Sequence, residues 1–197
     1  MPEGFIIVDG GAPLAGTVNI AGAKNSVLKL MAASLLAPGM TTIRNVPIIS
    51  DVTLMGEVLA NLGAKVSFAD RQVSIDTSPV DSIEAPYELV ARMRASIAVL
   101  GPLIGRFGRA HVAMPGGCQI GSRKLDMHIA GLEALGVVFD ISHGFIDASI
   151  PRGLKGAPVI LDFPSVGATE NLMMAAVCAQ GITTIDNAAR EPEIVDL

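Results

Sequence analysis

The chain has 197 residues, half of them hydrophobic and 17% charged, which is enough apolar material for the core of one large domain or of one and a half small ones. Its formal net charge of -5 argues against nucleic acid as a partner, because a phosphate backbone is bound by clustered Lys and Arg. With 21 Gly, 12 Pro and no Trp, the composition predicts a turn-rich α/β fold with an aliphatic and Met-rich core.

The N-terminal residues lack the basic region and the long apolar run of a signal peptide, and no apolar stretch approaches the roughly 20 residues of a membrane-spanning helix. Cys118 lies among glycines and Cys178 lies in an apolar helical pattern, which predicts two separate thiols in a reducing compartment. We therefore expect a cytoplasmic protein with no membrane contact.

Three successive segments share one order of elements: a helix, a strand, a second helix and then a pair of strands, with a period of roughly 70 residues. In the first copy, the patterns predict helices over 24–37 and 51–62 and strands over 41–46, 65–68 and 72–75. In the second copy, they predict helices over 87–105 and 124–135 and strands over 110–114, 137–141 and 145–149.

The third copy begins with a predicted strand over 159–163 and a helix over 168–179, after which residues 181–187 echo residues 39–45. Its second helix has only just begun at Leu197, so the rest of that helix and two strands, about 25 residues by analogy, are missing from the pattern. Because each repeat needs neighbours to cover its apolar face, we expect a truncated third unit and a longer native polypeptide.

Cys118 lies on a glycine-flanked loop between a predicted strand and a predicted helix. Arg123 and the N-terminal end of that helix would favour the thiolate, as a reactive or proton-donating cysteine requires. The alternative is a small hydrophobic side chain packed under a turn. Cys178, inside its apolar helix, is interpreted as core.

Lys24 and Asn25 open the first predicted helix shortly after Gly22, where backbone N–H groups and the helix dipole favour a phosphate or carboxylate. An ordinary exposed lysine at a helix start is the alternative. Arg94 interrupts an otherwise apolar helix and needs an anionic partner on such a face. The small residues of the turn over 165–169 repeat those of the turn over 20–24 and would let a ligand approach backbone amides.

His111, His128 and His143 have no metal-ligand spacing with one another or with the cysteines, so no metal site is predicted.

Four motifs occur in one order: Gly-Ala-Lys-Asn at 22–25, Met-Arg-Ala-Ser at 93–96, Pro-Gly-Gly-Cys at 115–118 and Ser-Val-Gly-Ala-Thr at 165–169. With Glu-Pro-Glu-Ile-Val-Asp at 191–196, they resemble the UDP-N-acetylglucosamine 1-carboxyvinyltransferase family of enolpyruvyl transferases over essentially the whole chain. The resemblance implies an inside-out α/β barrel fold, with two domains of three such repeats each and substrates bound between them. Residues 22–197 would form the first domain, incomplete at its C-terminal end, and residues 1–21 would form strands that pack with the second domain.

The resemblance further implies transfer of enolpyruvate from phosphoenolpyruvate to the 3-hydroxyl of UDP-N-acetylglucosamine, by addition and then elimination of phosphate, without a cofactor. This reaction is the first committed step of peptidoglycan synthesis, and so bears on the cell wall, cell shape and cell division. Cys118 matches the proton donor that the antibiotic fosfomycin alkylates, and Lys24, Asn25 and Arg123 match phosphoenolpyruvate contacts. The positions that match the nucleotide-sugar site are Arg94, Arg123, Lys124, Leu125, Asp126, Met127, Ser165, Val166 and Gly167.

Two departures from the family pattern matter. Lys124 stands where many relatives have proline, which would loosen the exit of the loop, and the second domain, which supplies a catalytic aspartate and further arginines, is not in this sequence. We therefore expect little or no turnover from this chain alone. The alternatives are the related transferase that acts on shikimate 3-phosphate, against which the Pro-Gly-Gly-Cys loop argues, and a non-catalytic half-enzyme or binding module.

Overall fold

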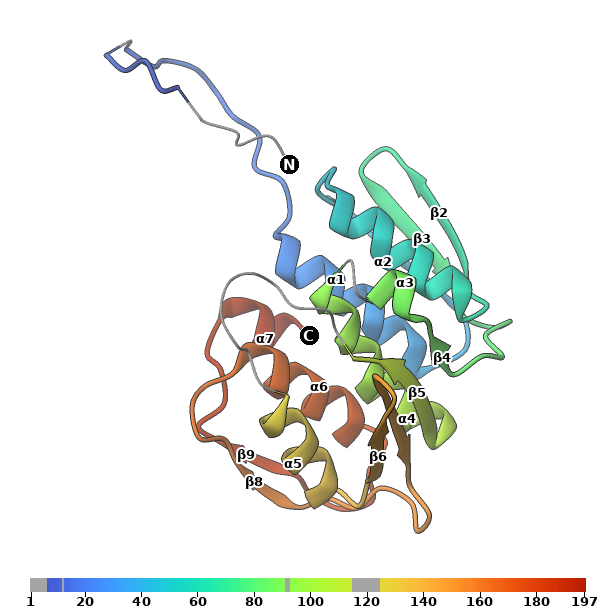
Figure 1. Ribbon diagram of the computed structural model, residues 1–197. Coiled ribbons are helices and arrows are strands. Elements are labelled where there is room, and N and C mark those ends of the chain that lie inside the picture. Colours follow the sequence, from blue (N-terminus) through green and yellow to red (C-terminus); the bar gives the residue numbers. More distant parts are fainter. Residues whose placement is uncertain (1–6, 12, 91–92, 115–124) are drawn as a thin grey trace.

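The computed structural model describes residues 7–11, 13–90, 93–114 and 125–197. Residues 7–11 and 13–21 are an exposed arm without helix or strand that extends away from the body of the molecule (Figure 1). That residues 1–21 form strands when they pack with a second domain stays a prediction. None of the helices in the described ranges has the length and apolar composition needed to cross a membrane.

The first repeat confirms the predicted order of elements. Helix α1 buries Val27, Leu28 and Met31 on one face, at the spacing of an amphipathic helix, and the following strands form an antiparallel sheet of order β1-β3-β2. The elements are α1 (Lys24–Ala33), the 3-10 helix η1 (Ser34–Leu36), β1 (Met40–Ile43), α2 (Ser50–Asn61), β2 (Lys65–Ala69) and β3 (Gln72–Asp76).

The second repeat forms a four-stranded sheet of order β4-β5-β7-β6, in which only the β4–β5 pair is parallel. Tyr87, the only tyrosine of the chain, is the first residue of the short helix α3 and is 55% exposed. The elements are β4 (Glu84–Ala85), α3 (Tyr87–Val90), the 3-10 helix η2 (Arg94–Val99), α4 (Leu100–Phe107), β5 (Arg109–Ala113), α5 (Asp126–Ala134), β6 (Val138–Ser142) and β7 (Phe145–Ser149).

The prediction of one continuous helix over 87–105 is wrong. Met93 has an extended backbone, with φ -145° and ψ 107°, so the helical conformation is interrupted there. The chain resumes as a 3-10 turn and becomes α-helical at Leu100. Pro102 fits this start because a proline in the first turn of a helix leaves no hydrogen bond unmade.

The third repeat contains β8 (Pro158–Ile160), α6 (Val166–Ala176), β9 (Thr184–Asp186) and α7 (Pro192–Asp196). Strand β8 pairs in parallel with β9, as β4 does with β5. The predicted echo between the first and third repeats is confirmed in the backbone, because Asn45 after β1 (φ 57°) and Asn187 after β9 (φ 56°) both adopt the left-handed conformation.

The two hairpins repeat each other as well. A two-residue turn joins β2 to β3 and another joins β6 to β7. All four turn residues have positive φ: 48° at Asp70, 59° at Arg71, 52° at His143 and 82° at Gly144. Positive φ at both central positions is the type I′ geometry, whose twist matches that of the strands it joins.

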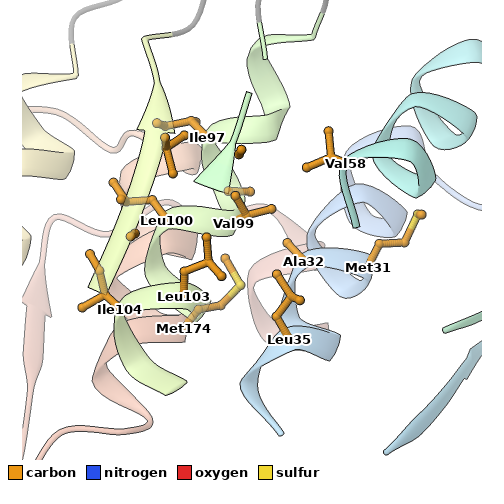
Figure 2. Close-up of a cluster of buried hydrophobic side chains, with 14 of the residues drawn as sticks. Met31, Ala32, Leu35, Val58, Ile97, Val99, Leu100, Leu103, Ile104 and Met174 are labelled. Carbon is orange, nitrogen blue, oxygen red and sulfur yellow. The ribbon is translucent and has the colours of Figure 1, made fainter. Parts of the chain in front are cut away.

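Helices form the centre of the molecule and the three sheets lie at its periphery (Figure 1). Helix α6 packs against α4, α5, η2 and α7. Figure 2 shows Leu103 of α4 beside Met174 of α6, with Leu35 of η1 close by, and all three side chains are buried. The segments that begin these helices are therefore held by one continuous core.

Candidate functional site

The N-terminal end of α1 presents Lys24 and Asn25 to solvent. No side chain caps this end, so no side chain occupies the N–H groups of its first turn. Lys24 Nζ lies 2.9 Å from Asp51 Oδ1 in the first turn of α2, and its side chain remains 53% exposed. Open N–H groups beside an exposed ammonium suit an anionic ligand.

Gly22 fixes the approach of the chain to this helix. Its N–H donates to the carbonyl oxygen of Asn45 at 2.9 Å, and a Cβ at position 22 would lie only 2.5 Å from that oxygen. Only glycine fits such a contact without a backbone shift.

The first turn of α5 contains Asp126 and Met127. Leu125, at the N-cap, is half-buried, Asp126 is exposed and Met127 is buried. The Asp126 Oδ1 accepts a hydrogen bond from the Met127 N–H at 2.9 Å. An open groove of about 230 Å³ separates this helix from β8. It is lined by Asp126, Met127, Ala130, Gly131, Ala134, Pro158, Val159, Ile160, Leu161 and Asp162.

Ser165 caps the first turn of α6. Its Oγ accepts from the Ala168 N–H at 3.4 Å, and its carbonyl oxygen accepts from Thr169 Oγ1 at 2.8 Å. Val166 and Gly167 are half-buried. A Cβ on Gly167 would lie 3.3 Å from His128 Cε1, so the absence of a side chain lets the imidazole of α5 lie against the start of α6.

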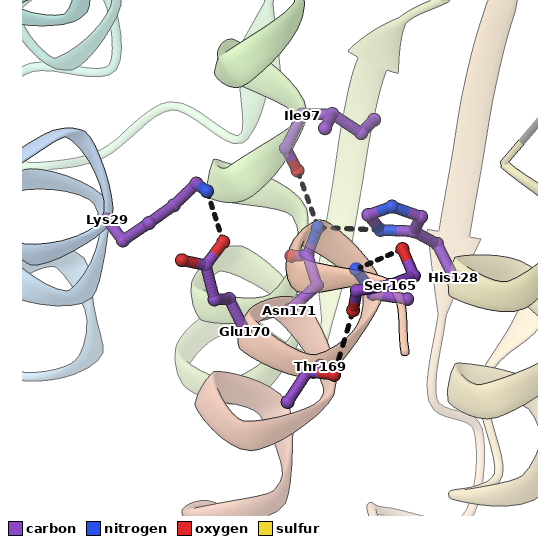
Figure 3. Close-up of polar contacts among 8 residues, drawn as sticks. Lys29, Ile97, His128, Ser165, Thr169, Glu170 and Asn171 are labelled. Carbon is purple, nitrogen blue, oxygen red and sulfur yellow. Dashed lines mark hydrogen bonds and ion pairs between the residues drawn. The ribbon is translucent and has the colours of Figure 1, made fainter. Parts of the chain in front are cut away.

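Buried polar side chains tie these helices together (Figure 3). The Asn171 carboxamide of α6 contacts Ile97 O in η2 at 3.1 Å and His128 Nδ1 in α5 at 3.0 Å. Glu170, the residue before it, pairs through Oε2 with Lys29 of α1. The other Glu170 oxygen, Oε1, is buried and has no hydrogen-bond partner among the described residues.

The Lys29–Glu170 pair also fixes how α1 and α6 are aligned along their axes. Lys29 lies five residues after Lys24, and Glu170 lies five residues after Ser165. At 1.5 Å of rise per residue, both helices therefore begin about 7 Å from their mutual contact. The start of α5 lies against that of α6, because His128 borders Gly167, and the starts of α1, α5 and α6 lie toward the left in Figure 1.

Several predicted site residues are not placed. Cys118, Arg123 and Lys124 lie outside the described residues, and for Arg94 only the backbone is described, at the start of η2. In the described ranges, no group of three His, Cys, Asp or Glu side chains is arranged to hold a metal ion. The structure therefore brings together the residues at the starts of α1, α5 and α6 and leaves the loop cysteine as a prediction.

The sequence matches, over residues 8–197, the family model described as EPSP synthase (3-phosphoshikimate 1-carboxyvinyltransferase). The chain belongs to this family. It is 54% identical over 191 residues to UDP-N-acetylglucosamine 1-carboxyvinyltransferase 2 of Carboxydothermus hydrogenoformans, an alignment that covers 97% of this chain and 45% of that protein. The resemblance seen in the motifs is thus confirmed, and the chain spans less than half the length of this relative.

Solved structures of the family show the same fold. The enolpyruvyl transferase NikO from Streptomyces tendae superposes with a TM-score of 0.81 at 24% identity, over 95% of this chain and 44% of that one. EPSP synthase from Acinetobacter baumannii superposes with a TM-score of 0.71 at 14% identity, over 91% of this chain and 42% of that one. The mixed α/β architecture is therefore that of the enolpyruvyl transferases.

Sequence reasoning missed Lys29, Asp51, Glu170 and Asn171. Glu170 and Asn171 could have been noticed, because two polar residues precede the apolar run Leu-Met-Met-Ala-Ala in a helix expected to be core. Lys29 and Asp51 carried no such signal, since each is an ordinary charged residue in an amphipathic helix. Their contribution depends on contacts between helices that no local pattern shows.

Cys178 is the free thiol within the described ranges. The residue is exposed, but its sulfur lies against Gly105, where an added Cβ would meet Sγ at 3.1 Å. Burial raises the pKa of this thiol above its usual value. A raised pKa lowers the thiolate fraction, so Cys178 is a poor nucleophile. Its interpretation as core is wrong, because α6 ends at Ala176 and Cys178, which follows the helix, is exposed.

Proposed function

We propose that this chain carries part of the active site of an enolpyruvyl transferase that moves enolpyruvate from phosphoenolpyruvate to the 3-hydroxyl of UDP-N-acetylglucosamine and releases phosphate. The observation that carries the proposal is the 54% identity, over 97% of the chain, to a protein named for that activity. The geometry supports it, because the starts of three helices lie toward the left in Figure 1 and can together receive a triply charged substrate and a diphosphate.

The proposed roles follow the helix starts. At α1, Lys24 and Asn25 bind phosphoenolpyruvate, and the ammonium of Lys24 stabilises negative charge as the phosphate leaves. Cys118 donates a proton to the methylene carbon while the oxygen of the sugar hydroxyl bonds to the neighbouring carbon and releases its own proton. Phosphate, neutralised by Arg123, then leaves as the new methyl group loses a proton and the double bond forms again. The nucleotide sugar binds along Arg94, Arg123, Lys124, Leu125, Asp126, Met127, Ser165, Val166 and Gly167.

We further propose that the helical centre and peripheral sheets form one inside-out α/β barrel domain of a cytoplasmic enzyme of peptidoglycan synthesis, and that residues 1–21 pack against a second domain. The alignment covers only 45% of the relative, which leaves room in that protein for a second domain. We therefore expect the 197-residue chain to bind its substrates weakly and to show little or no turnover.

Calorimetric titration of the chain with UDP-N-acetylglucosamine and, separately, with shikimate 3-phosphate tests the substrate. The family description favours the second ligand and the curated relative favours the first. We expect saturable binding of UDP-N-acetylglucosamine alone. Saturation by shikimate 3-phosphate instead would assign the chain to the other reaction, and robust phosphate release by this chain would refute its dependence on a second domain.

Intact mass after incubation with fosfomycin and UDP-N-acetylglucosamine tests the thiol. We expect one drug adduct on the unaltered chain and on Cys178→Ser, and none on Cys118→Ser. Cys178→Ser is the matched control for Cys118→Ser, because burial raises the pKa of the Cys178 thiol and so disfavours the thiolate that would react with the drug. An adduct that persists in Cys118→Ser would remove the catalytic assignment of Cys118.

A further inference from the structure

Asn171 lies where four segments of the chain meet. Its side chain projects from α6 toward η2, α4 and α5, and the residue is only 1% exposed. A carboxamide buried this deeply must find protein partners for both of its ends, because water does not reach it. Its partners therefore define what it does.

The orientation of this carboxamide is fixed by two backbone groups. Oδ1 accepts a hydrogen bond from the Gly101 N–H at 2.8 Å, and Nδ2 donates to the Ile97 carbonyl oxygen at 3.1 Å. A backbone amide can only donate and a carbonyl can only accept, so exchanging the two ends would break both bonds. The second Nδ2 proton remains for His128 Nδ1, which lies 3.0 Å away.

This arrangement selects one form of His128. A nitrogen that faces a donor must accept, so Nδ1 carries no proton and the neutral ring carries its proton on Nε2. The opposite edge of the ring borders the first turn of α6, because a Cβ on Gly167 would lie 3.3 Å from Cε1 and 3.4 Å from Nε2. Asn171 thus decides on which side of the imidazole the proton lies.

We propose that Asn171 is a positioning residue of the nucleotide-sugar site. It fixes the tautomer of His128 and holds η2 and the starts of α4 and α5 against α6, so that Asp126 and Ser165 act on the same ligand. The choice of ligand rests on the proposed function, whereas the contacts of Asn171 do not. Gly101 supports the arrangement, since a Cβ there would lie 2.4 Å from the Asn171 carbonyl oxygen and would force α4 away from α6.

The first test needs no substitution. Nitrogen-15 NMR of the imidazoles of the 197-residue chain, which has three histidines, should show His128 with an unprotonated, hydrogen-bonded Nδ1 and a protonated Nε2 at neutral pH. A protonated Nδ1 on His128 would overturn the proposal. His111 and His143 serve as internal references, because neither contacts Asn171 among the hydrogen bonds of the described residues.

The second test uses Asn171→Asp, a substitution of the same shape that cannot donate to Nδ1. We expect His128 to become protonated on Nδ1 and the affinity for UDP-N-acetylglucosamine to fall about tenfold, the equivalent of one or two hydrogen bonds. Asn61→Asp, the same change at the exposed C-terminal end of α2, is the control and should alter neither reading. An unchanged affinity in a folded Asn171→Asp chain would overturn the positioning role.

The His128 tautomer and the affinity for UDP-N-acetylglucosamine test the two proposals separately: the tautomer tests this inference, and the affinity tests the proposed function. If the unaltered chain shows the predicted His128 tautomer but binds no UDP-N-acetylglucosamine, the proposed substrate is wrong. In that case slowed hydrogen exchange at the Gly101 amide, lost in Asn171→Leu, which offers no acceptor, but not in Asn61→Leu, still decides whether Asn171 orders the four segments. Fast exchange at Gly101 in the unaltered chain would overturn the inference.

Discussion

Glu170 is a buried carboxylate with one oxygen on Lys29 and the other without a partner among the described residues. Burial raises its pKa above the usual value of 4.5, the Lys29 ammonium opposes this, and the carboxylates of Glu193 and Glu191 reinforce it. A raised pKa means that the folded chain holds this proton more tightly than the unfolded chain does. The stability it contributes is present below pH 4.5 and is lost as the pH rises through the raised pKa of the folded state.

We therefore predict that Glu170→Gln changes the pH dependence of stability. The free energy of unfolding of the unaltered chain, measured by urea titration relative to Glu170→Gln, should fall as the pH rises above 4.5. Asp76→Asn is the matched control of opposite sign, because the Ser78 N–H and hydroxyl lower the pKa of Asp76 and its contribution is lost as the pH falls. A constant difference between the unaltered chain and Glu170→Gln would contradict the prediction.

Lys24 should separate binding from stability. Its ion pair with Asp51 is partly exposed, so we expect Lys24→Met to change the free energy of unfolding by less than about 1 kcal/mol. Loss of a charged contact should weaken phosphoenolpyruvate binding by roughly tenfold to a hundredfold. Lys65→Met, at an exposed position of β2, should leave binding unchanged in the same calorimetric titration. Equal affinities of the two variants would remove Lys24 from the site.

Sequence alone could identify the residues at the helix starts, because Gly, small residues and Lys in a strand-to-helix turn have a local physical meaning. It could not identify Asn171 or Glu170 as connectors. Their effect arises from contacts with His128 and Lys29, which are 43 and 141 residues away in the chain. Burial of a polar group becomes visible only when the helices that surround it are in place.

At the scale of elements, glycines set how closely α6 approaches its neighbours. A Cβ at Gly101 of α4 would meet backbone, 2.4 Å from Asn171 O, whereas a Cβ at Gly131 of α5 would meet the side chain of Leu172 at 2.6 Å. A side chain can change its rotamer more easily than backbone can shift, so an added Cβ should destabilise the fold more at Gly101 than at Gly131.

We predict that Gly101→Ala lowers the free energy of unfolding by about 2–3 kcal/mol and that Gly131→Ala lowers it by about 1 kcal/mol or less. Alanine is the better helix former by roughly 0.5–1 kcal/mol, which offsets part of the cost where the neighbour can adapt. Urea unfolding followed by circular dichroism measures both. A larger loss at position 131 than at 101 would show that α4 adjusts more easily than the Leu172 side chain.

Hairpins and most helices were predictable to within a few residues, since alternation and helical periodicity are local signals. Strand β4 was not predicted, because two residues give no alternation, and α6 begins before the predicted position because the cap at Ser165 extends it. The division of 87–105 into three pieces could not be foreseen, since its apolar residues are compatible with one helix and no local signal marks the extended backbone at Met93.

At the scale of the whole molecule, the described residues of the arm, 7–11 and 13–21, are exposed throughout. Ile7, Val8, Leu14, Val18 and Ile20 are each at least 75% exposed. We predict that a chain beginning at Gly22 keeps the thermal midpoint of the 197-residue chain within about 2 °C and remains monomeric to higher concentration, because apolar exposed surface is removed. Calorimetry and sedimentation measure the two quantities, and a large fall in the midpoint would show that the arm folds onto the body.

Tyr87 gives the molecule an unusual optical property. With no Trp and a single Tyr in the sequence, intrinsic emission comes from one ring at the start of α3, which precedes the segment that carries Arg94. Tyr87 fluorescence will therefore report on the exposed surroundings of α3 and will respond little to changes in the aliphatic core. Because the sequence contains no Trp, a Trp introduced beside α5 or α6 would be the only Trp fluorophore of the chain. Its fluorescence could then report nucleotide-sugar binding at that position.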